Sequence, residues 1–87
     1  LDLSYNAFIT LPPLFCFYIQ HLTSLDLSHN NLKELPEELM ELKQLKTLLL
    51  SCNRLKELPE TIDQLVALED LKLAGNRKLI RLPRTIG

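Results

Sequence analysis

The sequence repeats with a period of 23 residues, and this periodicity constrains the fold more than any other feature of the chain. Asn30, Asn53 and Asn76 are spaced by 23 residues, whereas Asn6 lies 24 residues before Asn30. Each copy reads Leu-x-Leu-x-x-Asn and then Leu-x-x-Leu-Pro, with Phe8 replacing one leucine in the first copy. A fixed period of this length predicts stacked supersecondary units that bury a shared core.

The first part of each copy has the pattern of a short strand. Leu48 and Leu50 alternate with other residues, so both side chains point to the same side of a strand. Asn53 follows where the chain is expected to bend away from the strand. A buried asparagine at a bend pairs with backbone donors and acceptors that the strand leaves free. Stacked copies are therefore expected to form a parallel sheet with a ladder of asparagines inside.

The second part of each copy changes to a helical period. In the second copy the apolar stripe comprises Leu35, Leu39, Leu42 and Leu45. Their spacings of four, three and three residues are those of one helix face. Pro36 and Pro59 suit the first turn of a helix, and Glu37 and Glu60 suit its positive end. We expect one or two helical turns per repeat, partly of 3₁₀ type, on the side opposite the strands.

These motifs resemble those of leucine-rich repeat proteins over essentially the whole chain. The Leu-Pro-x-x-Leu/Ile type is similar to the intracellular repeats of Scribble- and Erbin-type scaffolds, of Ras-pathway leucine-rich proteins and of plant Ras-group proteins. The resemblance implies an α/β fold, a right-handed leucine-rich repeat solenoid with strands on the concave face and helical turns on the convex face. We expect one array of about four units, residues 1–24, 25–47, 48–70 and 71–87, as a fragment without caps.

The fourth unit adds a second resemblance. Its sequence LKLAGNRKLIRLPRTIG, with a longer turn after Asn76, is similar to units of nucleotide-binding immune receptors and some bacterial effector ligases. All these families use the repeats to bind other proteins, usually on the concave strand face. No segment of the chain matches their nucleotide-binding, ligase or PDZ parts.

Charge and cysteine content bear on the class of partner and on the cellular compartment of the protein. The net charge of −1 does not favour a general binder of nucleic acid, and the basic segment Arg77 to Arg84 lacks interleaved aromatics. This segment suits an acidic partner, a membrane surface or a solvated edge beside a further repeat. Cys16 and Cys52 form no disulfide framework, and no apolar run approaches the length of a membrane span. We expect a cytoplasmic protein, or one held at the inner membrane surface through a partner.

The positions between the strand leucines are the candidates for binding a protein partner. If the strands stack in register, Asp26, Leu49 and Lys72 form one outward row and Tyr5, His29, Cys52 and Gly75 another. The candidate protein-binding residues are Asp26, His29, Lys46, Leu49, Cys52, Asp70 and Lys72. Leu49 is either a central apolar anchor ringed by polar groups or an ordinary exposed leucine.

Enzymatic and metal sites are not favoured. Cys52 and His29 fall in one row and Asp26 is nearby in sequence, but no oxyanion site or pocket can be inferred on an open sheet face. One cysteine and one histidine also fall short of a usual metal ligand set. We therefore expect no catalytic, metal or cofactor-binding residues, and no cofactor.

The first copy departs from the pattern between Leu11 and Leu22. Counting back from Leu22, Ile19 takes the place of Leu42, and Phe15 or Cys16 takes the place of Leu39. The apolar residues left over are Leu14, Phe17 and Tyr18. They provide either a second protein-contact site on the convex face or cover for the end of the stack.

The sequence thus favours a non-enzymatic protein-interaction module of intracellular signalling. One alternative is the recognition part of a larger enzyme or receptor, such as an effector ubiquitin ligase or a nucleotide-switched receptor. Another is a structural unit that contributes only length and curvature. Sequence outside these residues would distinguish the interaction module from the recognition part of a larger enzyme or receptor.

Overall fold

Three short strands form a parallel sheet along one side of the molecule. The computed structural model describes residues 1–77 and 79. The strands β1 (Ser24–Asp26), β2 (Thr47–Leu49) and β3 (Asp70–Lys72) pair in the order β1-β2-β3. Leu25, Leu48 and Leu71 are in register across the three strands, which is the pairing that the 23-residue period predicts. Residues of the first repeat extend the sheet through a single bridge from Asp2 to Asp26.

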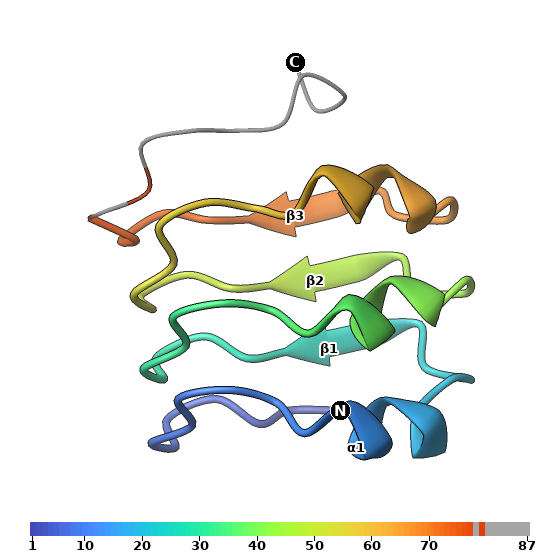
Figure 1. Cartoon of the computed structure of the whole chain (residues 1–87), viewed down its shortest axis with the longest axis horizontal. Coiled ribbons are helices and arrows are strands. Elements are labelled where there is room, and N and C mark those ends of the chain that lie inside the picture. Colours follow the sequence, from blue (N-terminus) through green and yellow to red (C-terminus); the bar gives the residue numbers. More distant parts are fainter. Residues whose placement is uncertain (78, 80–87) are drawn as a thin grey trace.

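A helical turn follows each of the first three Leu-Pro pairs and lies on the side opposite the sheet (Figure 1). The first turn is the α-helix α1 (Pro13–Tyr18), and the others are the 3₁₀ helices η1 (Glu37–Glu41) and η2 (Glu60–Gln64). The prediction of short, partly 3₁₀ turns is confirmed. Pro36 and Pro59 lie one residue before the helices as extended N-caps. None of the helices in the described residues is long and apolar enough to cross a membrane.

The core lies between the sheet and the helical turns. Its fully buried members include Leu25, Leu27, Leu32, Leu39, Leu42, Leu45, Leu48, Leu50 and Leu55. These are the template leucines of the second and third repeats, so the alternating and helical patterns point the same side chains inwards as predicted. Burying a leucine side chain contributes about 1.5–3 kcal/mol relative to leaving it exposed. The array is therefore held together mainly by the leucine template.

A ladder of asparagines runs through the bends that follow the strands. Asn30, Asn53 and Asn76 are all buried. The Nδ2 group of Asn53 donates to the carbonyl oxygens of Leu50 and Leu27, at 3.0 Å each, and its Oδ1 accepts from the N–H of Leu32 at 3.1 Å. Asn53 thus joins its own repeat to the preceding one. The predicted ladder is confirmed.

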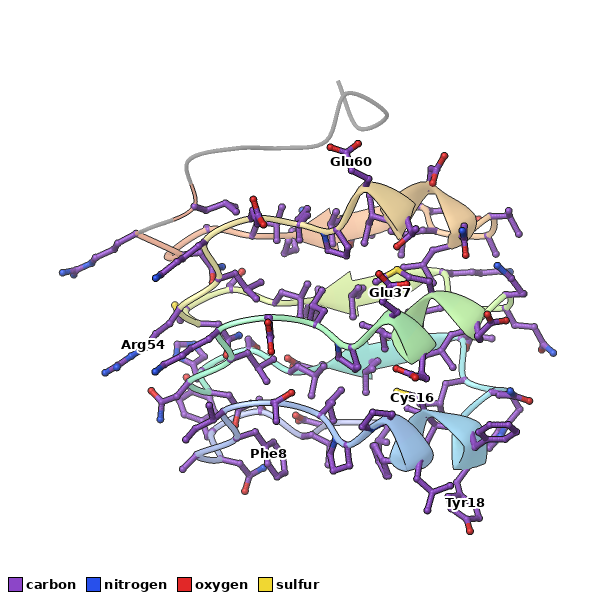
Figure 2. The ribbon with its side chains drawn as sticks, in the orientation of Figure 1. Phe8, Cys16, Tyr18, Glu37, Arg54 and Glu60 are labelled. Carbon is purple, nitrogen blue, oxygen red and sulfur yellow. The ribbon has the colours of Figure 1, made fainter. Side chains whose placement is uncertain are left out.

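The first repeat fits the template by means of its α-helix. Cys16 is buried in the position that Leu39 and Ile62 take in the next repeats, and Ile19 is buried in that of Leu42. The side chains of Leu14, Phe17 and Tyr18 are 66%, 67% and 72% exposed. Tyr18 points away from the stack at its N-terminal end (Figure 2). The surplus apolar residues of this repeat therefore face outwards.

Candidate protein-binding surface

The outward side of the sheet carries the row predicted from the sequence. Asp26 pairs with Leu49 across β1 and β2, and Leu49 pairs with Lys72 across β2 and β3. Paired residues on neighbouring strands project to the same side, about 4.8 Å apart. We call the outward residues of these strands, with the flanking Lys46, the strand face. The outward strand residues are Ser24, Asp26, Thr47, Leu49, Asp70 and Lys72. An acid, a leucine and a base therefore stand side by side at its centre.

Hydrogen bonds within the strand segment fix the carboxylate of Asp26. Its Oδ1 accepts from the backbone N–H of Ser28 at 3.0 Å and also from the Ser28 hydroxyl. The same arrangement joins Asp2 to Ser4 in the first repeat. There the hydroxyl and backbone donors of Ser4 lower the pKa of the Asp2 carboxyl, because they stabilise its charged form. The Asp-x-Ser pattern therefore orients these carboxylates before any partner binds.

Leu49 is less exposed than the sequence suggests. The pattern predicts an exposed leucine, but the side chain is half-buried, as are Thr47 at the other end of β2 and Asp26 beside it. Strand neighbours on both sides cover part of a central residue in a parallel sheet. Leu49 thus offers a partner a limited apolar area within a polar surround.

The charged residues at the start and end of the strands are held to different degrees. The Nζ of Lys72 lies 3.4 Å from Oδ1 of Asp70, and the two side chains are 62% and 47% exposed. A surface ion pair of this kind contributes about 0–1 kcal/mol. The side chain of Lys46 is exposed, whereas its carbonyl oxygen accepts from the N–H groups of Glu69 and Asp70 at 2.8 and 3.0 Å. Lys46 therefore has a fixed backbone and an accessible ammonium group.

The second predicted row lies where the strands turn into the loops, and it has an unusual backbone. Tyr5, His29 and Cys52 have φ values of 57°, 57° and 59°, and Gly75 has a φ of 83°. This left-handed region is uncommon for residues other than glycine. The rings of Tyr5 and His29 stack with centroids 4.2 Å apart and planes 7° from parallel. The leucine and asparagine pattern does not predict this backbone, although Gly75 in the fourth copy is a signal for it.

Comparison with known proteins identifies the repeat. The family model described as "Leucine rich repeat" matches residues 20–77. The chain belongs to the leucine-rich repeat family. A solved structure of the leucine-rich repeat protein LIC12759 of Leptospira interrogans aligns with 33% identity and a TM-score of 0.73. The alignment covers 95% of the present chain and 20% of that protein. No curated protein matches the sequence.

These matches confirm the predicted fold class, a leucine-rich repeat solenoid with parallel strands on one side and helical or 3₁₀ turns on the other. They do not distinguish the Scribble- and Erbin-like subtype, which stays a prediction. The chain spans a fifth of the length of the Leptospira protein. Leucine-rich repeats of this family are generally protein-interaction modules and are typically non-enzymatic.

The two cysteines of this leucine-rich repeat array occupy different environments. Both are free thiols, with Cys16 buried and Cys52 exposed. Burial raises the pKa of Cys16, and the nearby Glu38 carboxylate raises it further, because both disfavour the thiolate. Among the described residues no group of three or more His, Cys, Asp or Glu side chains is placed to hold a metal ion.

Proposed function

We propose that this leucine-rich repeat array binds a protein partner of an intracellular signalling system through its strand face. The observation that carries the proposal is the in-register row of Asp26, Leu49 and Lys72 across three paired strands. The row places a partly accessible apolar side chain between an acid and a base. Interface hot spots commonly have such an apolar centre within a polar rim.

Pre-organisation supports the same function. The Asp26 carboxylate is already bonded to Ser28, and the Lys72 ammonium lies beside Asp70. The backbone beneath them is fixed by parallel pairing and by the asparagine ladder. Each side chain that needs no ordering on binding saves about 0.5–1.5 kcal/mol. A rigid face of this kind achieves affinity without folding on contact.

A cytoplasmic location is part of the proposal. The supporting observation is that Cys16 and Cys52 are both free thiols, and Cys52 is exposed to solvent. Exposed free thiols are more common in reducing compartments than in secreted proteins. The recognition part of a larger enzyme or immune receptor is the second candidate. Its support is that the array aligns with only 20% of a longer leucine-rich repeat protein.

The test begins with peptides selected by display on the immobilised 87-residue chain. Their affinities are then measured by calorimetry for the wild type, Leu49→Glu and the control Val66→Glu. Val66 is 75% exposed and lies outside the strand face, so its substitution introduces the same charge elsewhere. We expect Leu49→Glu to weaken binding by about 30-fold or more, as for a hot-spot residue, and Val66→Glu to change it by less than about twofold.

Circular dichroism and thermal melting keep the test interpretable. Leu49→Glu should retain the folded spectrum because its side chain is only half-buried, whereas Leu48→Glu should unfold the chain because Leu48 is fully buried. Wild-type affinity in a folded Leu49→Glu variant would overturn the role of the strand face. So would an equal loss of affinity in Val66→Glu.

A further inference from the structure

A cleft lies at the edge where the strands turn into the loops, outside the strand face. Its volume is about 640 Å³, and its lining includes Asn31, Cys52, Arg54, Gly75 and Arg77. Arg54 extends from this edge into solvent (Figure 2). The cleft therefore combines an open shape with two guanidinium groups that the proposed function does not use.

The row of left-handed residues explains why the surface is hollow at this point. Along that row the side chains become smaller, from the stacked rings of Tyr5 and His29 to Cys52 and finally to Gly75. The Sγ of Cys52 would lie 2.9 Å from a Cβ at Gly75, so the thiol rests against the glycine. A small thiol and a glycine leave open the space that larger side chains fill beside the first two repeats.

The neighbouring row has the opposite trend and supplies the charge. Asn31, Arg54 and Arg77 are equivalent positions, each directly after a ladder asparagine. The backbone of Arg54 is fixed, because its N–H donates to the carbonyl oxygen of Leu32 at 2.9 Å. Two guanidinium groups thus project from successive loops beside the two small residues of the first row.

No acidic side chain of the described chain neutralises these arginines. Within residues 1–77 and 79 the only salt bridge joins Asp70 and Lys72. Residues 78–87 contain no aspartate or glutamate, and the cleft lining contains none. Guanidinium groups bind carboxylates through paired N–H donors, in a geometry that lysine does not reproduce. Two unneutralised arginines in one cleft therefore favour a ligand that carries carboxylates.

We propose that this cleft binds an acidic segment of a protein partner, with adjacent carboxylate side chains pairing with Arg54 and Arg77. The inference rests on the proposed function, since it takes the occupant to be a protein, and it adds the chemistry of that occupant. Cys52 follows Leu49 by three residues, so the cleft adjoins the strand face. A peptide crossing the face towards the loops reaches the arginines.

Nuclear magnetic resonance of the ¹⁵N-labelled chain provides the test. The probe is the peptide acetyl-Gly-Glu-Glu-Gly-amide, and its Gln-Gln counterpart is the uncharged control. We expect saturable shifts of the Nε–H signals of Arg54 and Arg77 and of the amides of Cys52 and Gly75. Arg54→Gln and Arg77→Gln should each weaken binding about tenfold, the effect of losing a charge-assisted hydrogen bond.

Lys56→Gln is the matched variant. It removes one positive charge two residues after Arg54, from an exposed side chain outside the cleft lining, and should change affinity by less than about twofold. As a second readout, the bound Glu-Glu peptide should slow alkylation of the exposed Cys52 by iodoacetamide.

Several results would overturn the proposal. They are equal binding of the Gln-Gln peptide, equal weakening by Lys56→Gln, tighter binding of inorganic phosphate than of the peptide, and no saturable shift at about 10 mM peptide. The strand face is tested separately. If the Glu-Glu peptide does not bind but Leu49→Glu still weakens binding of the display-selected peptides, only the cleft proposal is wrong. If the Glu-Glu peptide binds as expected but Leu49→Glu has no effect on the display-selected peptides, only the strand-face proposal is wrong.

Discussion

The first and third repeats use one template but stand in different surroundings. In the third repeat Asn53 is buried, and its side-chain amide forms hydrogen bonds with the backbone of the second repeat. In the first repeat Asn6 is exposed, and within residues 1–77 and 79 its Nδ2 donates only to the carbonyl oxygens of Leu3 and Ser4 in its own segment. The same residue thus links repeats in one place and supports only a local bend in the other. The ladder stabilises the array through contacts between neighbours.

The helical turns of the two repeats agree on the inside and differ on the outside. Cys16 in α1 and Ile62 in η2 are both buried in the same layer of the core. The outward residues of α1 include Phe17 and Tyr18, whereas those of η2 are acidic or amide side chains. The template therefore constrains the inward positions and leaves the outward positions open to other roles.

Among the differences between these two repeats, the largest effect is expected from replacing an asparagine that joins two repeats. Asn53→Ala leaves the N–H of Leu32 without its side-chain partner. The carbonyl oxygens of Leu27 and Leu50 each lose one donor and keep the other, from Asn30 and Asn76 respectively. An unpaired buried N–H costs about 1–3 kcal/mol and each lost hydrogen bond about 0.5–1.5 kcal/mol, so we expect a loss of about 2–4 kcal/mol in the free energy of unfolding.

Urea unfolding followed by circular dichroism measures this loss, with Asn6→Ala as the matched variant. Because Asn6 is exposed, its replacement should change stability by no more than about 0.5 kcal/mol. Equal losses of stability for the two variants would contradict the inference that Asn53 links two repeats whereas Asn6 supports only a local bend.

A smaller effect on stability is expected from the ionisation of Cys16. Ile62, at the equivalent position of the third repeat, has no ionisable group. The pKa of the buried thiol is raised above its ordinary value of 9.0 by burial and by Glu38. The unfolded thiol therefore ionises first, and the stability that it contributes is complete below that value and is lost as the pH rises towards the folded pKa. We expect the wild type to lose stability above about pH 9 more steeply than Cys16→Ala.

Urea midpoints measured for both proteins across this pH range provide the comparison. Cys16→Ala should be less stable at neutral pH, because it leaves a cavity, but its stability should fall less at alkaline pH. The control is Cys52→Ser, since Cys52 is exposed, and it should keep the wild-type slope. Parallel curves for Cys16→Ala and the wild type would show that the thiol of Cys16 has no part in the alkaline loss.

The periodicity was enough to predict the fold, because the spacing of the residues determines which side chains point into the core. Leu48, Leu50 and Asn53 face inwards in any chain with this spacing, and the structure buries all three. The partial burial of Leu49 depends instead on the neighbouring strands, which alternation within one strand does not describe. The left-handed backbone at Cys52 depends on the loop, and only Gly75 indicated it.

The candidate site was predictable only as a set of positions. The rows form as the register predicts, but their binding roles stay predictions for Asp26, His29, Lys46, Leu49, Cys52, Asp70 and Lys72. The cleft was not predictable, because it arises between two rows. One row loses side-chain volume towards Gly75 while the other gains it at Arg54 and Arg77. The sequence pattern of single repeats therefore does not reveal a cleft that forms between side chains of neighbouring repeats.

The smallest effect on stability is expected at the outward positions where the two helical turns differ. Phe17→Ser and Tyr18→Ser alter side chains that are largely in solvent, so the free energy of unfolding should change by no more than about 0.5 kcal/mol. Glu60→Ser in η2 is the matched control, because Glu60 also lies in a helical turn and is exposed. If the strand face is the contact surface, all three variants should bind the display-selected peptides with wild-type affinity in calorimetry. A loss of affinity in Phe17→Ser and Tyr18→Ser, but not in Glu60→Ser, would instead place the contact on the aromatic side of α1, because these substitutions leave the strand face unchanged.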